Sequence, residues 1–486
     1  MALTWTALLD ELRRADLLVE APANGPDPSG IGVDSRTIQR GMLYVALRGS
    51  QADGHRFVPD AVRRGAAAVL VEAPQQPGVS QIVVRDAHRA ALVLGSAWYG
   101  HPARGLTLIG VTGTNGKTTT TGLIRHLFNE GHAAGSIGTL GAFDGHGKAI
   151  PSTAGSLTTP GPIDLQATLA SLVERGATHV AMEASSHSLD QRRLDGLSFA
   201  AGVFTNLTRD HLDYHGTMES YLASKLRLSA LLGLGGIEVV NLDDDNWQVM
   251  APRTPRLTFG IHPSSDVRAT GAVLDAAGSR FQLSGRFGTA DVALPLLGDF
   301  NVANALAAAA TALGLGQPLA TVVQRLAAAP QVPGRMERIS DTPCIVLRDY
   351  AHTPDALERA LTSLRPLTRG RLIVVFGCGG DRDRGKRPIM GRIAAELAHL
   401  AVATSDNPRT EDPEAIIDDI EQGMNGMPHL RISDRLAAIH AALNEGRPGD
   451  TILLAGKGHE TYQIIGTEKI DFDEREIVQK AVRGEK

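Results

Sequence analysis

The sequence predicts an α/β protein of three domains, and three observations lead to this prediction. Apolar runs typical of buried parallel strands alternate with segments of helical spacing along most of the chain. One strand-to-helix junction is the glycine-rich stretch from Gly110 to Thr120, GVTGTNGKTTT. Proline and glycine breaks at His101-Pro102 and in residues 327–339, AAAPQVPGRMERI, divide the chain. We therefore expect domains over residues 1–102, 103–334 and 335–486.

Composition narrows the classes of function. A formal net charge of -5 predicts no general attraction to nucleic acid. The chain has no apolar run of about 18 residues, so no membrane span is expected, and the opening MALTWTALLDELRR reads as an amphipathic helix rather than a signal peptide. Cys344 and Cys378 cannot build a disulfide framework and lack metal-ligand spacing. Reduced thiols and a cytoplasmic location are therefore expected.

The first hundred residues predict a small α/β unit. Residues 41–49 and 66–72 read as strands with a helix between them, and residues 82–100 read as a strand that turns into a helix with Asp86 as its N-cap. Two polar clusters, VDSRT at residues 33–37 and GSQADGH at residues 49–55, fit either turn chemistry or a ligand site.

The stretch around GTNGKTT has the pattern of a phosphate-binding turn. It follows the apolar run LTLIG and precedes a segment of helical spacing, so backbone N–H groups would converge on an anion at the helix N-terminus. Lys117 would then reach the β- and γ-phosphates, and the Thr118 hydroxyl would hold Mg²⁺. The strict motif requires glycine where this chain has Val111. The alternative is a glycine- and threonine-rich turn with a solvated lysine.

Several polar residues of the central region follow predicted strands or lie on helices. Glu183 ends the strand of residues 178–183, where open α/β sheets bind ligands, and can bind Mg²⁺ or be an ordinary loop carboxylate. His211 is either a ligand of a second metal or structural. Lys225 is predicted to be a half-buried lysine with a lowered pKa, or a snorkelling surface lysine. Residues 257–297 predict short strands, and the following helix carries Asn301 and Asn304 on one face, to contact adenine or to cap.

In the last third of the chain, polar clusters follow successive strands. They are DYAH, GCGGDRDR, DNPR and GKGHE, and the carboxyl ends of parallel strands bring such clusters to one edge of a sheet. This repetition argues against independent surface loops.

The motifs GTNGKTT, MEASSHSLDQRR, TNLTRDHLDYHG, GDFNVANALAA, PGRME and DYAHTPDAL, with Lys225 between them, closely resemble the Mur ligases of peptidoglycan synthesis. The resemblance extends from about Val33 to Glu460. It implies a uridine-nucleotide domain, a central P-loop ATPase-like domain with an added small β-sheet, and a Rossmann-like third domain. It also implies ATP and Mg²⁺ as cofactors and a monomeric enzyme. The substrates would be UDP-N-acetylmuramoyl-dipeptide and meso-diaminopimelate, joined through an acyl phosphate.

The resemblance also assigns roles to residues. Catalysis would use Lys117, His211 and Lys225. ATP would contact Gly113, Thr114, Asn115, Gly116, Lys117, Thr118, Thr119, Asn301, Asn304, Arg335 and Asp349. The uridine substrate would contact Val33, Ser35, Ser50, Gln51, Ala52, Thr158, Thr159, Ser185, Gln191 and Arg193. Diaminopimelate would contact Arg382, Asp406, Asn407, Pro408, Arg409, Gly456 and Glu460. The metal ligands would be Thr118, Glu183, His211 and Lys225, the last as a carbamate. Leu157 stands where the family usually has Asn, so one substrate contact lacks its usual side chain.

Four alternatives stay open at this stage. A lysine-adding ligase would lack Arg409, whose fork matches the second carboxylate of diaminopimelate. Folylpolyglutamate synthase usually lacks a first domain with a DSR loop. A GTPase-like switch would need an Asn-Lys-x-Asp motif, which this sequence does not contain. A structural ATP-binding protein without chemistry would not need Glu183, His211 and Lys225 together.

Overall fold

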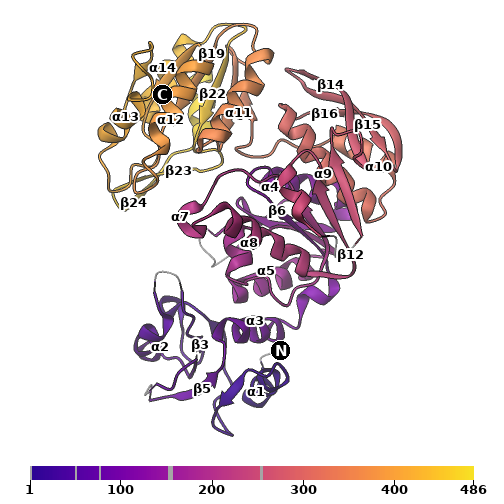
Figure 1. The fold of residues 1–486 in the computed structure, drawn as a ribbon. Coiled ribbons are helices and arrows are strands. Elements are labelled where there is room, and N and C mark those ends of the chain that lie inside the picture. The colour runs from indigo at the N-terminus through magenta and orange to yellow at the C-terminus, as the bar shows by residue number, and fades with distance from the viewer. Residues whose placement is uncertain (1–2, 50–51, 76–77, 152–156, 252–254, 486) are drawn as a thin grey trace. The chain divides into compact units, whose positions relative to one another are not determined.

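The computed structural model describes residues 3–49, 52–75, 78–151, 157–251 and 255–485. The chain forms two compact units, one of residues 1–265 with 307–317 and the other of residues 266–306 with 318–486. Both units are built from sheets covered by helices, and the predicted α/β class is confirmed (Figure 1). In the described part of the chain, no helix combines the length and hydrophobicity that a membrane crossing requires.

The first unit begins with a sheet of strand order β1-β5-β4-β3-β2, in which β2 to β5 are parallel and β1 is antiparallel. Alternate residues of its strands face opposite helices: Leu70 packs in a cluster with residues of α1 and α3, whereas Val69 packs in a cluster with residues of α2. The predicted N-cap is confirmed, because Asp86 Oδ1 accepts the Arg89 N–H at 2.9 Å. The elements are α1 (Trp5–Arg14), β1 (Leu18–Glu20), β2 (Ile31–Gly32), β3 (Leu43–Val45), α2 (Val58–Arg63), β4 (Ala68–Val71), β5 (Ser80–Val84) and α3 (Ala87–Trp98).

The same unit continues with a larger sheet whose strands run in the order β13-β12-β11-β6-β10-β7-β8-β9. Strands β13 to β7 in this order are parallel, and β6 lies between β10 and β11. The carboxyl ends of β7, β10, β6 and β11 are therefore adjacent at one edge. The elements are β6 (Thr107–Thr112), α4 (Lys117–Phe128), β7 (Ala134–Gly138), β8 (Gly141–Phe143), β9 (Ala149–Ile150), α5 (Pro162–Glu174), β10 (His179–Glu183), α6 (Ser186–Asp190), β11 (Phe199–Phe204), α7 (Leu212–His215), α8 (Met218–Ala230), β12 (Leu232–Asn241) and β13 (Arg256–Gly260).

The second unit contains an antiparallel meander and a second α/β sheet. The meander confirms the predicted short strands and comprises β14 (Val267–Asp275), β15 (Gly278–Gly285) and β16 (Gly288–Leu294), with α10 (Leu319–Ala327) in contact with β16. Helix α9 (Asp299–Gly314) follows the meander, as predicted.

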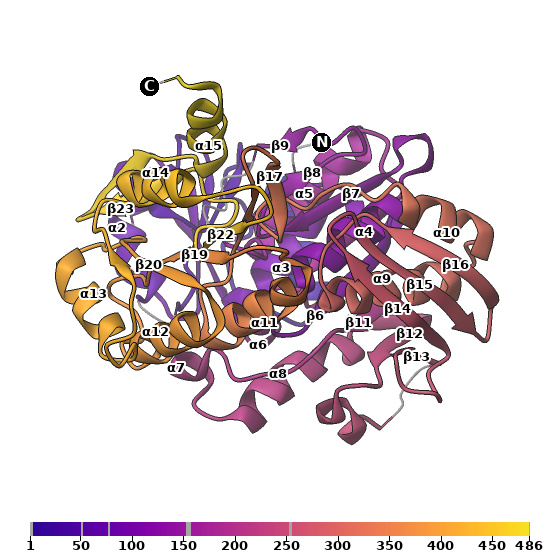
Figure 2. The same cartoon turned by 90° about the horizontal axis from the view of Figure 1, so that it is seen from above.

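The second sheet of this unit has the order β17-β18-β22-β19-β20-β21, parallel from β18 to β21. Residues of α11, α12 and α13 form the core on one face, and residues of α14 and α15 form it on the other (Figure 2). The elements are β17 (Glu337–Ser340), β18 (Ile345–Asp349), α11 (Pro354–Leu364), β19 (Leu372–Phe376), α12 (Lys386–Leu397), β20 (Leu400–Ala403), α13 (Pro413–Glu421), β21 (Leu430–Arg431), α14 (Arg435–Glu445), β22 (Thr451–Ala455), β23 (Tyr462–Ile465), β24 (Glu468–Asp471) and α15 (Glu474–Arg483).

Candidate active site

The glycine-rich turn between β6 and α4 is fixed by the loop that follows β11. Thr114 N donates to the Asn206 carbonyl at 2.7 Å, and the Thr205 hydroxyl donates to the Asn115 carbonyl at 2.7 Å. Gly113 has φ +148, and a Cβ there would lie 1.9 Å from Thr205 Oγ1. Only glycine fits this position. Val111 is a buried residue inside β6, so the departure from the strict motif falls within the strand.

The N-terminus of α4 carries the groups expected of a phosphate site. Thr118 and Thr119 are buried on its first turn, and Gly116 precedes it with φ +83. Lys117 Nζ donates to the carbonyls of Gly113 at 3.0 Å and Thr114 at 2.7 Å. The lysine thus folds over the turn, at a helix end that attracts anions.

Lys225 lies against the same turn. Its side chain is buried, Nζ donates to the Gly113 carbonyl at 2.7 Å, and Nζ lies 4.3 Å from the centre of the Tyr221 ring. Burial, reinforced by the Lys117 charge, holds the pKa of Lys225 well below its ordinary value, against the attraction of Asp210. The alternative of a snorkelling surface lysine is wrong. The expectation of half burial was too weak, because α8 places Lys225 in the interior.

Glu183 ends β10 and is buried. Its Oε1 accepts the Thr139 N–H at 2.8 Å and its Oε2 accepts the Thr139 hydroxyl at 3.1 Å. Gly138 leaves room for this carboxylate, since a Cβ there would lie 2.3 Å from Oε1. Thr158 Oγ1 is 3.3 Å from Thr139 Oγ1, which extends the cluster to a predicted substrate residue.

The other predicted substrate residues of this region form one network with Glu183. The Thr159 hydroxyl donates to the Glu183 carbonyl at 2.8 Å and accepts the Ser185 N–H at 3.3 Å. Arg193 donates to the Thr159 carbonyl at 2.9 Å through Nη1, and to Gln191 Oε1 at 2.9 Å through Nε. Leu157, by contrast, is 47% exposed.

His211 follows β11 and precedes α7 with φ +52. Its side chain is 46% exposed, and its Nε2 lies 3.5 Å from Asp210 Oδ2. The His187 ring lies 4.9 Å away, edge to face. Burial lowers the pKa of His211, and it lowers that of His187 to about 4 with the help of the neighbouring His211 and His215. Neutral imidazoles, the form that binds metals, are thus favoured at neutral pH.

Of the predicted uridine-site residues that the structure describes, Val33 and Ser35 come after β2 and Ala52 comes after the neighbouring strand β3 in the small first sheet. Val33 follows β2, and Ser35 begins a short 3₁₀ turn and is buried. Ala52 follows β3, whereas Ser50 and Gln51 lie outside the described residues. His55 fixes this second loop, because its Nε2 accepts the Glu72 N–H at 2.9 Å and its Nδ1 lies 2.7 Å from Asp53 Oδ1.

In the second unit, the predicted nucleotide residues form two local groups. Asn304 Nδ2 donates to Asn301 Oδ1 at 3.0 Å, so the two amides share one face of α9 as predicted. The Arg335 guanidinium lies 4.6 Å from the centre of the Tyr350 ring. Asp349 ends β18 and accepts the Met336 N–H at 2.6 Å. Burial raises the pKa of this carboxyl to about 6, against the influence of Arg335 and the backbone donors.

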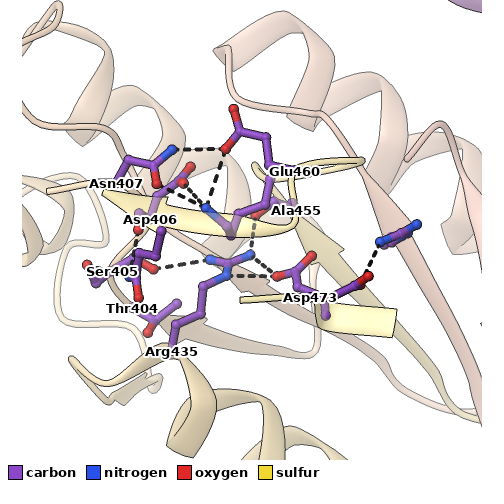
Figure 3. Close-up of polar contacts among 12 residues, drawn as sticks. Thr404, Ser405, Asp406, Asn407, Arg435, Ala455, Glu460 and Asp473 are labelled. Carbon is purple, nitrogen blue, oxygen red and sulfur yellow. Dashed lines mark hydrogen bonds and ion pairs between the residues drawn. The ribbon is translucent and has the colours of Figure 1, made fainter. Parts of the chain in front are cut away.

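The DNPR and GKGHE loops follow β20 and β22 in the same sheet. Asn407 Nδ2 donates to Glu460 Oε2 at 2.9 Å (Figure 3). Lys457, in the GKGHE loop, also bonds the DNPR loop, because its Nζ donates to Asn407 Oδ1 at 3.0 Å. A Cβ on Gly456, which has φ +114, would lie 2.8 Å from Asp406 Oδ2.

Arg409 approaches the loop that follows β19. It has φ +53, and its Nη1 donates to the Gly380 carbonyl at 2.7 Å. Both Arg409 and Arg382 flank Gly379, where a Cβ would lie 2.9 Å from Arg409 Nη1 and 3.8 Å from Arg382 Cγ. Pro408, between Asn407 and Arg409, is buried. The expected convergence at one sheet edge thus holds for three loops of this unit.

Comparisons with known proteins agree with these motifs. Family models match residues 28–95 (Mur ligase family, catalytic domain), 111–312 (Mur ligase middle domain) and 334–458 (Mur ligase, glutamate ligase domain). The chain is 44% identical over 470 residues to the UDP-N-acetylmuramoyl-L-alanyl-D-glutamate--2,6-diaminopimelate ligase of Geobacillus kaustophilus (strain HTA426), covering 94% of this chain and 95% of the relative. The chain belongs to the Mur ligase family.

Two further matches also cover nearly the whole chain. A ligase of the same name from Gloeobacter violaceus (strain ATCC 29082 / PCC 7421) is 46% identical over 465 residues, with 94% of each chain covered. A solved structure of a ligase of this name matches with a TM-score of 0.68 and 34% identity, covering 100% of this chain and 99% of that one.

Sequence reasoning missed several residues that this Mur ligase places within the candidate site. Thr139 follows β7 and donates a hydrogen bond to Glu183. The sequence feature that could have identified it is its position after an apolar strand. Tyr221 covers Lys225 four residues earlier on the same helix. Lys457 lies inside the GKGHE motif, between the predicted contacts Gly456 and Glu460, and this position is its sequence signal.

The raised pKa of Asp349 predicts a pH-dependent effect of Asp349→Asn. The ordinary pKa near 3.8 rises to about 6 in the folded protein, which therefore holds this proton more tightly than the unfolded chain. This carboxyl consequently lowers stability as pH rises from about 4 to about 6, and the neutral amide does not. The difference in thermal midpoint, variant minus wild type, should thus be more positive at pH 8 than at pH 4. Asp471→Asn on exposed β24 should follow the wild type, and a difference for Asp349→Asn that does not change with pH would contradict the argument.

Proposed function

We propose that this Mur ligase adds meso-diaminopimelate to the D-glutamyl γ-carboxylate of UDP-N-acetylmuramoyl-L-alanyl-D-glutamate, with ATP converted to ADP and phosphate. The observation that carries the proposal is the activity named for relatives that match nearly the whole chain at 44% and 46% identity. Arg409, in the DNPR loop, is the local feature that agrees with it.

The reaction follows from the chemistry of a carboxylate, which is a poor electrophile. Its oxygen attacks the γ-phosphorus of ATP, an O–P bond forms, and ADP leaves. The diaminopimelate amine then attacks the acyl carbon to give a tetrahedral intermediate, which expels phosphate as the amine loses a proton. Both steps move negative charge onto phosphate oxygens, so fixed cations and backbone donors lower the barriers.

The triphosphate of ATP would bind at the turn of Gly113, Thr114, Asn115 and Gly116, with Lys117, Thr118 and Thr119 on the helix N-terminus. Support comes from the buried hydroxyls of this first helical turn and from Lys117, which already lies over the turn. The remaining contacts would come from Asn301, Asn304, Arg335 and Asp349.

Mg²⁺ would be held by the Thr118 hydroxyl and Glu183, with His211 and a carbamate on Lys225 serving a second ion. Bound there, it would neutralise charge on the phosphates. Among the described residues, no three His, Cys, Asp or Glu side chains are arranged to hold a metal ion. This donor set still fits Mg²⁺, which usually binds one or two carboxylates and takes its other ligands from water and phosphates.

The remaining predicted contacts complete the proposal. Val33, Ser35, Ser50, Gln51 and Ala52 would bind the uridine nucleotide, and Thr158, Thr159, Ser185, Gln191 and Arg193 the muramoyl-dipeptide. Diaminopimelate would be bound by Arg382, Asp406, Asn407, Pro408, Arg409, Gly456 and Glu460. The three-domain division at residues 102 and 334, the cytoplasmic location and the monomeric state stay predictions.

The assay that tests this function measures phosphate release with ATP and the UDP-muramoyl-dipeptide. Release should depend on meso-diaminopimelate and be much weaker with L-lysine, which lacks the second carboxylate. Arg409→Ala should raise the KM for diaminopimelate about 100-fold and leave the KM for ATP unchanged, because a bidentate guanidinium–carboxylate pair is lost. Arg392→Ala, an exposed arginine on α12, is the matched control. Equal release with both amines, or unchanged diaminopimelate affinity in Arg409→Ala, would refute the assignment.

Lys225 should act as a carbamate. A buried amine with a lowered pKa can attack CO₂, forming an N–C bond and releasing a proton, which turns a cation into an anion. Lys225→Ala should lose activity by about 100-fold, and short-chain carboxylic acids should restore part of it by replacing the anion. Loss without any rescue, measured beside the exposed-lysine control Lys148→Ala, would argue against the carbamate.

A further inference from the structure

Lys457 is a buried charge at the carboxyl end of β22, and none of its surface is exposed. Its Nζ donates to Asn407 Oδ1 at 3.0 Å and lies 3.4 Å from Glu460 Oε2 and 3.6 Å from Asp406 Oδ1. One ammonium thus touches three side chains that come from two different loops. Its role is not explained by the reaction described above.

The first consequence concerns the Asn407 amide. Its Oδ1 accepts from Lys457 Nζ and from the Ile464 N–H at 3.0 Å, which uses both lone pairs of that oxygen. The amide nitrogen must then face the other way, and it donates to Glu460 Oε2 at 2.9 Å. Lys457 therefore determines which face Asn407 presents and where Glu460 is held.

The second consequence concerns charge. Asp406 is 6% exposed, and its Oδ1 has no hydrogen-bond partner. Without the ammonium at 3.6 Å, this buried carboxylate would lose its nearby positive charge while Glu460 remained close. Two partly buried carboxylates that lack a cation repel each other. They would then move away from the positions that an incoming amine needs.

We propose that Lys457 is a positioning residue of the diaminopimelate pocket, which fixes Asn407, Glu460 and Asp406 in the arrangement that receives the amino acid. This inference rests on the proposed function. The lysine does not touch the substrate in this account, and it acts through the three side chains around it. Its removal should therefore affect the amino acid and spare ATP and the UDP substrate.

The variant that tests this is Lys457→Met, which keeps the length of the side chain and removes its charge. The KM for meso-diaminopimelate should rise about tenfold or more, because hydrogen bonds to charged groups are lost, while the KM values for ATP and the UDP substrate stay within about twofold. Single-turnover ADP formation without any amine should keep its wild-type amplitude, since the first chemical step needs no diaminopimelate. Lys480→Met, an exposed lysine on α15 of the same unit, should behave as the wild type in every measurement.

A second variant covers the case in which Lys457→Met does not fold. Lys457→Gln retains a donor for Asn407 Oδ1, so its KM for diaminopimelate should lie between those of the wild type and Lys457→Met. In the Glu460→Gln background, Lys457→Met should raise this KM by a smaller factor than it does alone, because one shared interaction is already gone.

The outcomes separate the two proposals. If the wild type releases no phosphate on addition of diaminopimelate, the proposed function fails. If the wild type responds but both Lys457 variants keep its KM for diaminopimelate, the positioning role alone is refuted. A KM for ATP that rises in parallel, or a lost ADP burst in a folded variant, would likewise overturn it.

Discussion

Parallel strand pairing is the constraint on which the site residues of both units depend. Neighbouring parallel strands end at one edge, so residues far apart in the sequence meet there once the strands have paired. In the first unit this edge collects the glycine turn after β6, Thr139 after β7, Glu183 at the end of β10 and Thr205 after β11. In the second unit it collects Asp349, the DNPR loop and the GKGHE loop. The sheets thus supply the geometry, and the loops supply the chemistry.

The two buried lysines, Lys225 and Lys457, have different surroundings, and these surroundings act differently on their charges. Lys225 has a carbonyl and an aromatic ring as its contacts, so burial works against its protonated form. Lys457 has two carboxylates and an amide around it, so its charge is balanced and serves to hold other groups. The charge of a buried lysine is therefore disfavoured on helix α8 beside the glycine turn, and it is balanced in the GKGHE loop.

The sequence predicts the structure correctly wherever residue type and spacing within a short stretch decide it. The strand, glycine turn and helix around Gly113, the N-cap at Asp86 and the shared face of Asn301 and Asn304 all follow from spacing and residue type. The sequence does not predict the burial of a side chain when that burial depends on packing against residues far away along the chain. The residues next to Lys225 in the sequence do not indicate that its amine reaches the Gly113 carbonyl. Thr139 comes close to Glu183 only because β7 pairs with β10. Roles carried by single side chains in loops, such as that of Lys457, depend on partners some fifty residues away along the chain.

If the DNPR and GKGHE loops together form the amino-acid pocket, amide hydrogen exchange should detect the bound amino acid in both loops. Exchange would be compared with and without saturating meso-diaminopimelate, in the presence of ADP and the UDP substrate, with L-lysine as the matched amine. Diaminopimelate should slow exchange in peptides covering residues 405–411 and 456–465, and lysine should do so far less. Protection confined to other segments, or equal protection by both amino acids, would contradict it.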